Sequence, residues 1–400
     1  MRLKHVIRGC ASALAVAALS APAAVADTPG QYIVTDFAVP GTDTIYSFTP
    51  AGVRSTITTG GNLGAVEGIV RLGSNDYVVA DQGPTNTATV DGKVVRVTNG
   101  AQTVLGNGNL LVNPHALALS RDRKLLYVAE RAPGRIVEIT IATGAQRLVA
   151  SGGGITDLRG IAVEQSGSLL VVNSGVTGAL LRVNAVTGAQ LPLLNGPPLT
   201  DPRGIVLRPN GDAVIGDSGG IGDGSLINVD LPTLATSTLA GGAFFGGSSV
   251  PGALAFETSG NLVVGDRNSN AAGAAGRLFR VNNGGAITEV VTPASNLLSE
   301  ANGVVVVPPK CGGKFATIVG SPGKDTLPGT NGADVIVALG GKDTVKGKGG
   351  MDVICGGVGN DILSGGGGKD TIIPGKGKDR VSGGAGRDTL RCSPLDPRCG

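Results

Sequence analysis

The sequence predicts an all-β protein with two successive parts, a six-bladed β-propeller followed by a parallel β-roll. Three observations support this fold class. The 400 residues include 68 Gly and 22 Pro, but no Trp and only 7 Phe, a composition that suits short strands and tight turns better than helices. A period of roughly 45 residues runs through most of the chain. Near the C-terminal end, aspartates recur every nine residues.

The first 26 residues have the features of a secretory signal peptide. Three basic residues precede the apolar run ASALAVAALSA, and an Ala-Val-Ala motif ends at Ala26. We therefore expect a secreted, extracellular protein, either free or associated with the cell surface. No later segment has the length and apolarity of a membrane helix. A net charge of +3 without a basic, aromatic-rich block gives no indication of a nucleic-acid partner.

From Gln31 to Pro308, short apolar runs end in a polar residue at spacings of 43 to 49 residues. An earlier apolar run, such as GIAV at Gly160, precedes these segments, and two further strand-like segments follow. Each unit therefore has four strands in roughly 45 residues, which matches a propeller blade. The polar residues that end the second strands are Asp36, Asp81, Glu130, Asn173, Asp217 and Asp266.

The two ends of this region complement each other. The first strand-like segment, Tyr32 to Asp36, corresponds to the second strand of a blade, and Gly303 to Val307 supplies a first strand that has no blade of its own. Pairing the two segments closes a six-bladed ring without an unpaired edge. The pattern GIAVEQSGSLLVVNSG resembles the NHL-repeat and streptogramin-lyase-like propellers, and the resemblance extends over Gln31 to Pro308.

Antiparallel pairing brings the residues before the first strands together on one face of a propeller, near its axis. Arg159 and Arg203 are 44 residues apart, so they occupy equivalent positions on adjacent blades and suit a carboxylate or phosphate. With Asn302 they are candidate contacts for an unknown small-molecule, glycan or protein ligand. The alternative is structural: the acidic strand ends cap turns, and the arginines pair with carboxylates. The residues before the first strands are Glu67, His115, Arg159, Arg203 and Asn302.

The resemblance also implies an enzymatic alternative, a metal-dependent lyase or lactone hydrolase at the channel mouth. His115 in NPHALAL is similar to the PHGI motif of streptogramin lyases, and it is the only histidine after the signal peptide. Because it has no histidine partner, we expect a recognition platform rather than an enzyme, with His115 and Glu67 as the candidate catalytic residues. The residues that resemble the Glu/Asn/Asn/Asp metal set of gluconolactonase-like propellers are Glu67, Asn173, Asn302 and Asp217.

The nine-residue period is carried by eight aspartates in one unbroken frame. Each aspartate has Gly two positions earlier and Leu, Ile or Val two positions later. The repeat G-x-x-G-x-D-x-(aliphatic)-x resembles the RTX, or haemolysin-type, calcium-binding nonapeptide over about 320–390. The resemblance implies a parallel β-roll in which two repeats form one coil and residues eighteen apart stack. The expected metal ligands are Asp325, Asp334, Asp343, Asp352, Asp361, Asp370, Asp379 and Asp388.

Stacked carboxylates at a strand spacing of about 4.8 Å repel one another unless a cation lies between them. Ca²⁺ fits best, because it accepts six or more oxygen ligands from carboxylates and backbone carbonyls. Two fully occupied columns would hold roughly six ions, and their binding would contribute to folding. The segment Lys310 to Gly400 has 13 basic and 9 acidic residues, so we expect weaker calcium binding than in an acidic roll.

A thin aliphatic core and four cysteines complete the expectations for the C-terminal part. Cys311, Cys355, Cys392 and Cys399 favour disulfides in an oxidising compartment. If the segment before the first repeat stacks in register, Cys311 and Cys355 lie about 12 Å apart, beyond disulfide reach. Either Cys311 folds back along the roll or the pairing is different, and three connectivities stay open. The expected core residues are Ile318, Leu327, Ile336, Val345, Ile354, Leu363, Ile372, Val381 and Leu390.

The expected domain organisation has five parts. A signal peptide occupies 1–26, the propeller 27–308, a junction and cap 309–319, the calcium-binding roll 320–391, and a C-terminal tail 392–400.

Overall fold

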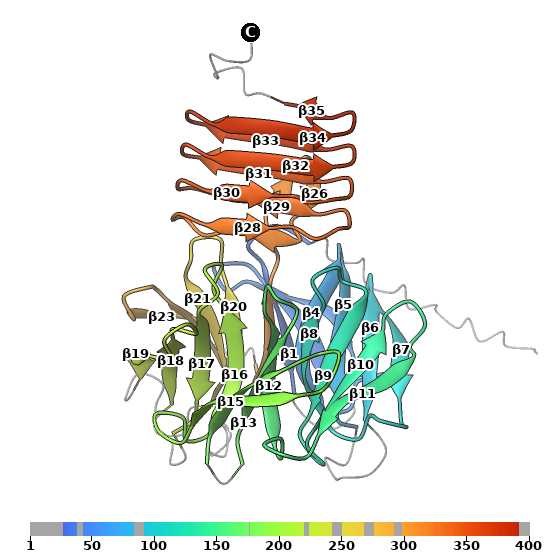
Figure 1. Cartoon of the computed structure of the whole chain (residues 1–400). Helices are drawn as coiled ribbons and strands as arrows, with labels where there is room; N and C mark the ends of the chain where they lie inside the picture. The colour runs from blue at the N-terminus through green and yellow to red at the C-terminus, as the bar shows by residue number, and fades with distance from the viewer. Residues whose placement is uncertain are drawn as a thin grey trace, which may run out of the picture.

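The computed structural model describes residues 27–37, 43–83, 92–175, 177–219, 224–241, 250–267, 276–291 and 298–391. The elements in these ranges are strands, so the predicted all-β class is confirmed. Figure 1 shows a propeller coloured blue to gold and an orange-red roll that stands on one of its faces. Within the described part of the chain, no helical segment has the length and apolarity needed to cross a membrane. The expected signal peptide and the tail with Cys392 and Cys399 lie outside the described residues.

Six antiparallel sheets of four strands form the blades, as predicted. The innermost strands are β4 (Val66–Gly73), β8 (Pro114–Leu119), β12 (Leu158–Val163), β16 (Pro202–Leu207), β20 (Pro251–Phe256) and β24 (Ala301–Val306). The second strands are β1 (Tyr32–Asp36), β5 (Asp76–Asp81), β9 (Leu125–Glu130), β13 (Leu169–Asn173), β17 (Ala213–Asp217) and β21 (Leu262–Asp266).

The outer half of each blade consists of two further strands. The third strands are β2 (Thr44–Phe48), β6 (Lys93–Thr98), β10 (Arg135–Thr140), β14 (Ala179–Val183), β18 (Ser225–Val229) and β22 (Arg277–Val281). The outermost strands are β3 (Arg54–Thr59), β7 (Ala101–Asn107), β11 (Gln146–Ser151), β15 (Gln190–Asn195), β19 (Thr236–Gly241) and β23 (Ile287–Val291).

The ring closes by pairing the two ends of the propeller sequence. Strand β24 lies antiparallel to β1, with Val304 opposite Val34 and Val306 opposite Tyr32. This is the pairing that the unmatched first and second strands predict. It removes the two edges that an open ring would expose.

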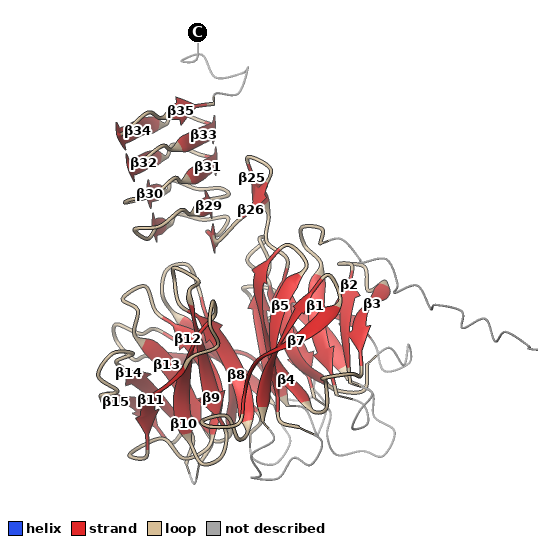
Figure 2. Cartoon of the chain, turned by 90° about the vertical axis from the view of Figure 1, so that its right-hand side faces the viewer, coloured by secondary structure: helices blue, strands red, loops and turns tan. Residues whose placement is uncertain are grey.

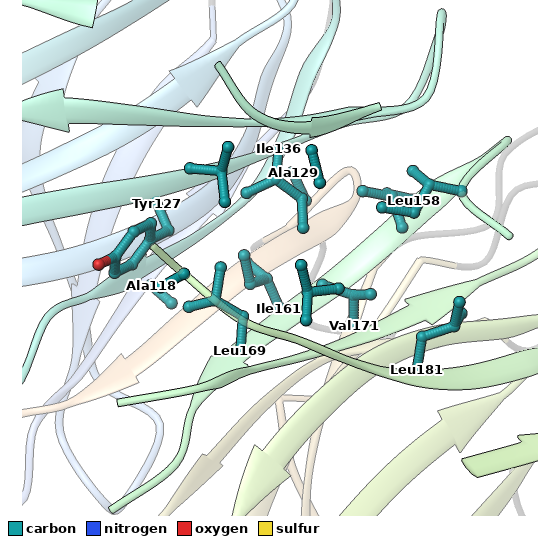
Figure 3. Close-up of a cluster of buried hydrophobic side chains, with 14 residues drawn as sticks. Ala118, Tyr127, Ala129, Ile136, Leu158, Ile161, Leu169, Val171 and Leu181 are labelled. Carbon is teal, nitrogen blue, oxygen red and sulfur yellow. The ribbon is translucent and has the colours of Figure 1, made fainter. Parts of the chain in front are cut away.

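The propeller core lies between neighbouring blades and consists mainly of aliphatic side chains. Figure 3 shows one such cluster, in which Ala129 and Ile136 of one blade pack against Leu158, Ile161 and Val171 of the next. The second strands are buried along almost their whole length, because both of their faces contact an adjacent blade. Continuous apolar runs such as LLVV are therefore required there rather than alternation of apolar and polar residues.

The roll consists of two parallel sheets whose strands stack along its axis. Ile336 lies opposite Ile354, so two nonapeptides form one coil, as predicted. One sheet contains β28 (Thr326–Pro328), β30 (Thr344–Lys346), β32 (Ile362–Gly367) and β34 (Arg380–Ala385). The other contains β27 (Ile318–Val319), β29 (Val335–Val337), β31 (Val353–Val358), β33 (Thr371–Lys376) and β35 (Thr389–Leu390).

The inner aliphatic residues form the expected thin core with one exception. Leu390 is 54% exposed, so its prediction as a core residue is wrong. It belongs to the last described strand of its sheet, and no further described coil stacks on it. Ile318 and Val381 are partly buried against the others. The fully buried members are Leu327, Ile336, Val345, Ile354, Leu363 and Ile372.

A short hairpin lies between the propeller and the roll. Strands β25 (Lys310–Cys311) and β26 (Lys314–Phe315) pair with each other, and Figure 2 shows them beside the roll rather than within its stack. The hairpin brings Cys311 against Val335 and Val353 on the outer face of one sheet. Cys311 and Cys355 form a disulfide there with a Cα–Cα distance of 5.9 Å. Of the two alternatives, the structure therefore has Cys311 folded back along the roll.

Candidate functional site

The aspartates of the roll lie where a glycine-rich turn enters each short strand. A glycine two positions before the aspartate permits the turn, and the aspartate, which directly precedes the strand, directs its side chain back into the roll. Asp388 is half-buried near the end of the stack, whereas the seven earlier aspartates are at most 6% exposed. The structure thus places all eight predicted residues in two inward-facing columns, which we call the aspartate columns.

Backbone hydrogen bonds connect successive aspartates within each column. The amide N–H of Asp343 donates to Oδ1 of Asp361 at 2.9 Å, and that of Asp352 donates to Oδ1 of Asp370 at 3.0 Å. Four other pairs repeat this bond, each spanning eighteen residues. One oxygen of each accepting carboxylate is therefore engaged by the protein itself, which the sequence did not predict.

The second carboxylate oxygen has no such bond in the middle of the columns. Among the described residues, Oδ2 of Asp343, Asp352, Asp361 and Asp370 is buried and lacks a hydrogen-bond partner. A buried, unpaired carboxylate oxygen is costly without compensation. Burial, with a smaller contribution from neighbouring carboxylates, raises the pKa of Asp343 and of Asp352 to about 6. Burial also raises the pKa of Asp361. These oxygens therefore require a positive charge near them at neutral pH.

Glycine is needed where the carboxylate rests on the turn. A Cβ added at Gly347 would lie 2.3 Å from Oδ2 of Asp352, and one at Gly365 would lie 2.2 Å from Oδ2 of Asp370. The missing side chain leaves the space into which the aspartate oxygen projects. This cradle, lined by a carboxylate and backbone oxygens, matches the hard oxygen donors that Ca²⁺ prefers.

The lysines that precede aspartates lie on the outer surface of the roll, away from the aspartate columns. Lys324, Lys342, Lys369 and Lys378 are exposed, whereas the adjacent aspartates are buried. Their charges are therefore screened by solvent, and they weaken a cation site less than an inward-facing lysine would. The positive excess of the roll lies on its outside.

The propeller channel holds the second group of candidates. A cavity of about 100 Å³ at the channel is lined by Glu67, His115, Arg159, Arg203 and Asn302, so all five predicted residues converge. Arg267 also lines it, and the sequence reasoning missed this residue. Arg267 directly follows β21, the second strand of its blade. The residues after the second strands could have been searched for charged side chains, just as the residues before the first strands were.

The acidic strand ends serve as caps for the loops that enter the innermost strands. Oδ1 of Asp36 accepts hydrogen bonds from the amides of Ser299 and Glu300 at 2.8 and 2.7 Å. Asp81, Glu130, Asn173, Asp217 and Asp266 accept comparable bonds from loop amides. The structural alternative for these residues matches the geometry, because their oxygens satisfy backbone donors inside the propeller.

The two predicted arginines pair with carboxylates two residues before them. Arg159 donates from Nε and Nη2 to Asp157 at 2.9 and 2.7 Å. Arg203 pairs with Asp201, and its Nε and Nη2 both donate to Oδ2 of that residue. Each guanidinium is therefore fixed in orientation, and its Nη1 takes no part in the pair. The repeated arrangement on adjacent blades confirms that the 44-residue spacing predicts equivalent positions.

Glu67 and His115 meet inside the channel. Nε2 of His115 lies 3.6 Å from Glu67, while its Nδ1 donates to the carbonyl oxygen of Arg159 at 3.0 Å. Burial, with the nearby arginines, holds the pKa of His115 well below its usual range, so the ring is neutral. Burial raises the pKa of Glu67, and the pairing of Glu67 with Arg267 at 3.3 Å opposes this rise.

The amide and acid residues of the gluconolactonase-like set do not form one group of ligands. Glu67 and Asn302 line the cavity, and Nδ2 of Asn302 donates to the carbonyl oxygen of Val66 at 2.9 Å. Asn173 and Asp217 instead direct their oxygens to the loop amides of Asp157 and Thr200.

The fold and the aspartate columns together define a modular β protein with a calcium-binding part. Residues 319–354 and 356–390 match the family described as RTX calcium-binding nonapeptide repeat (4 copies). This stretch consists of RTX repeats, and RTX nonapeptide repeats bind calcium. The predicted cofactor, Ca²⁺, is thus confirmed at the level of the repeat family.

Solved structures show likeness to this chain in fold. A chain of a nidogen/laminin complex is 13% identical, with a TM-score of 0.55 over 69% of this chain and 98% of that chain. TolB from Acinetobacter baumannii is also 13% identical, with a TM-score of 0.48 over 64% of this chain and 62% of its own. At this identity, the likeness to the nidogen/laminin chain indicates the fold alone. No curated protein matches the sequence significantly.

Proposed function

We propose that this chain is a secreted protein in which calcium, held between coils of the roll, folds or stabilises that domain, while the propeller recognises a ligand. The observation that carries the proposal is the set of buried Oδ2 atoms without partners at Asp343, Asp352, Asp361 and Asp370. Four such oxygens in stacked positions demand compensation by positive charge, and the side chains inside the roll supply none.

The eight aspartates are the proposed metal ligands. Each contributes one charged oxygen, and among the described residues no three His, Cys, Asp or Glu side chains are grouped around a point. The remaining ligands would therefore be backbone oxygens of the glycine-rich turns. A mixed set of carboxylate and carbonyl oxygens suits Ca²⁺, whereas Zn²⁺ prefers His and Cys, and Mg²⁺ requires a tight octahedron.

Export is part of the proposal. The signal-like first 26 residues and the Cys311–Cys355 disulfide both support an oxidising destination. Calcium is scarce in cytoplasm and abundant outside cells, so the roll would remain loose before export and become ordered afterwards. The organisation that we propose is a propeller at 27–308, a junction and cap at 309–319, and a roll at 320–391.

Recognition would occur at the rim of the propeller channel rather than inside it. A cavity of about 100 Å³ accommodates only a few water molecules. Arg159, Arg203 and Asn302 line this cavity, and the pairs with Asp157 and Asp201 fix both guanidinium groups. Fixed guanidinium groups on adjacent blades support binding of an acidic group on a small molecule, glycan or protein.

The chain offers separate spectroscopic reporters for its two parts. All four tyrosines lie in the propeller, at Tyr32, Tyr46, Tyr77 and Tyr127, and there is no tryptophan. Met351 in the roll is 64% exposed, so Met351→Trp introduces a reporter there with little disturbance of packing. The test is a titration of the chelated mature chain with CaCl₂, following Trp emission for the roll and near-ultraviolet dichroism of the unsubstituted chain for the propeller.

The expected result is a saturable change in the Trp signal with an unchanged tyrosine signal. Magnesium at equal concentration serves as the control for ionic strength and should produce a much smaller response. A roll that unfolds at the same temperature with calcium and with chelator would contradict the proposed role of the ion.

A further inference from the structure

The eight turns of the roll have two different backbone conformations. In the last six turns, the second and fourth residues of the repeat have positive φ, for example Lys348 at 76° and Gly350 at 113°. In the first two turns, the corresponding residues, Ser321 with Gly323 and Thr330 with Gly332, do not have positive φ. The positive-φ residues of the last six turns are Leu339, Gly341, Lys348, Gly350, Gly357, Gly359, Gly366, Gly368, Gly375, Gly377, Gly384 and Gly386.

The first two turns also satisfy their own carboxylates. Oδ2 of Asp325 accepts hydrogen bonds from the amide and hydroxyl of Ser321 at 2.6 and 3.0 Å. Oδ2 of Asp334 accepts the same two bonds from Thr330 at 2.7 and 3.0 Å. In the following turns the position of Ser321 and Thr330 is occupied by Leu339, Lys348 or glycine, none of which offers a hydroxyl.

This first coil has further support from neighbouring parts of the chain. Thr317 donates to Oδ1 of Asp334 at 3.4 Å, and the guanidinium of Arg121 in the propeller donates to the carbonyl oxygen of Pro328. The adjacent hairpin is held by Arg71, whose guanidinium lies 4.3 Å from the ring of Phe315.

We propose that the coil containing Asp325 and Asp334 is a calcium-independent seed, in which the hydroxyl and amide groups of Ser321 and Thr330 take the place of a cation. The calcium-dependent turns begin at 338–342 and continue to 383–387. Calcium therefore orders the roll outward from the propeller, each coil stacking on one that is already formed. This inference rests on the proposed function and narrows its set of ligands: the six aspartates from Asp343 to Asp388 respond to the ion, whereas Asp325 and Asp334 have partners within the protein.

The seed removes the least favourable step of assembly. A parallel coil cannot form alone, because its backbone groups and aliphatic residues need a neighbouring coil. A metal-independent coil fixed on the propeller provides this neighbour before any ion binds. Each later coil then requires only its own ions and eighteen residues of chain.

Hydrogen exchange of the full mature chain, measured by mass spectrometry in EGTA and in CaCl₂, tests the proposal. We expect residues 320–337 to remain protected in EGTA, with exchange at least about tenfold slower than residues 356–390. Calcium should protect 356–390 and leave 320–337 almost unchanged. Equally fast exchange of both segments in EGTA would overturn the seed.

The double variant Ser321→Gly/Thr330→Gly provides a second measurement. It removes both hydroxyls and permits the positive φ of the later turns, so protection of 320–337 should be lost in EGTA and restored by calcium. Bound calcium per chain, measured by equilibrium dialysis, should rise above that of the unsubstituted protein. Unchanged protection in EGTA together with an unchanged calcium count would overturn the assignment.

Ser364→Gly/Ser382→Gly is the matched control, because these serines lie in the roll but outside the turns that hold the aspartates. It should leave the calcium count unchanged. The experiment also separates the two proposals. If no segment between 338 and 390 responds to calcium, the proposed function fails, whereas a responsive roll with an equally responsive first coil contradicts the seed alone.

Discussion

The backbone amide of Asp343 donates a hydrogen bond of 2.9 Å to Oδ1 of Asp361, eighteen residues further along the chain. One carboxylate oxygen thus holds two coils together, while Oδ2 of the same residue is buried without a partner among the described residues. The aspartate therefore has two separate tasks, which its two oxygens divide. One task is to bond the neighbouring coil, and the other is to hold a cation.

Substitutions at Asp361 can separate these tasks. Asp361→Asn retains an oxygen that accepts from Asp343 but removes the charge, so we expect calcium affinity to fall by about tenfold or more. Asp361→Ala removes both oxygens, so in saturating calcium its roll should be less stable than that of Asp361→Asn by about 1–3 kcal/mol. Calorimetric titration and urea unfolding in saturating calcium measure the two quantities. Equal stability of the two variants in saturating calcium would show that the Oδ1 bond contributes little.

Two glycines of one turn should respond very differently to alanine. A Cβ at Gly365 would lie 2.2 Å from Oδ2 of Asp370 and 2.5 Å from the carbonyl oxygen of Gly383, so Gly365→Ala should displace the carboxylate and weaken calcium binding. We expect a loss of about 1–3 kcal/mol in stability with calcium present. At Gly367 the nearest atom is 3.8 Å away and φ is not positive, so Gly367→Ala is the control. Similar midpoints of calcium-dependent melting for both variants would contradict the cradle.

The sequence predicted the parts of the roll that follow from its period. A repeat of nine residues with two repeats per coil fixes the stacking of Asp343 on Asp361 and the inward direction of Leu363. The propeller closure between β1 and β24 was predictable for a similar reason, since only one pairing leaves no strand unpaired. In both cases a periodic pattern determines the register without knowledge of side-chain contacts.

Features that depend on local backbone conformation or on non-periodic segments were less predictable. The different roles of Ser321 and Lys348 depend on φ, and both occupy the same position of the repeat. The hairpin that brings Cys311 to Cys355 lies outside the repeat, so the period did not indicate its direction. Leu390 fits the pattern of a core residue, but its position in the last described strand leaves it exposed.

The backbone of Lys348 has a φ of 76°, a conformation that is favourable for glycine and strained for other residues. Lys348→Gly should relieve this strain and stabilise the roll by about 0.5–1 kcal/mol, because the left-handed region costs an L-residue about 1–2 kcal/mol and glycine loses part of this gain through its flexible unfolded state. Lys346→Gly is the matched control, since it removes the same charge from an extended strand and should destabilise by about 0.5–1 kcal/mol. Opposite signs in urea unfolding are expected, and the same sign for both would contradict the argument.

The disulfide between Cys311 and Cys355 closes a loop with a sequence separation of 44 residues. On the chain-entropy argument, the loss of such a link lowers the free energy of unfolding by up to about 4 kcal/mol. We expect Cys311→Ser/Cys355→Ser to lower the melting temperature of the roll while the tyrosine signal of the propeller keeps its midpoint. Titration of free thiols in the unsubstituted, denatured chain checks the pairing, because thiols at Cys311 and Cys355 would contradict the link.

We expect the free energy of unfolding of the propeller to fall as pH rises, because Asp36 loses its proton. Burial raises the pKa of this carboxyl from 3.8 to about 6 in the folded chain. Because the folded value lies above the unfolded one, the favourable contribution is present below pH 4 and is lost between about pH 4 and pH 7. A difference of about two pKa units corresponds to roughly 3 kcal/mol as an upper limit.

Asp36→Asn should abolish this pH dependence, because the amide oxygen can still accept from Ser299 and Glu300 and carries no charge. The variant should match the unsubstituted chain near pH 4 and exceed its stability at pH 7 by up to about 3 kcal/mol in urea unfolding followed through tyrosine. Asp217→Asn is the contrasting control. Both oxygens of Asp217 accept hydrogen bonds from backbone amides, those of Thr200 and Gly219. The NH₂ group that the substitution introduces would therefore face an N–H donor, and the variant should be less stable at both pH values. A loss of stability at pH 7 in Asp36→Asn would show that the capping bonds need the charge.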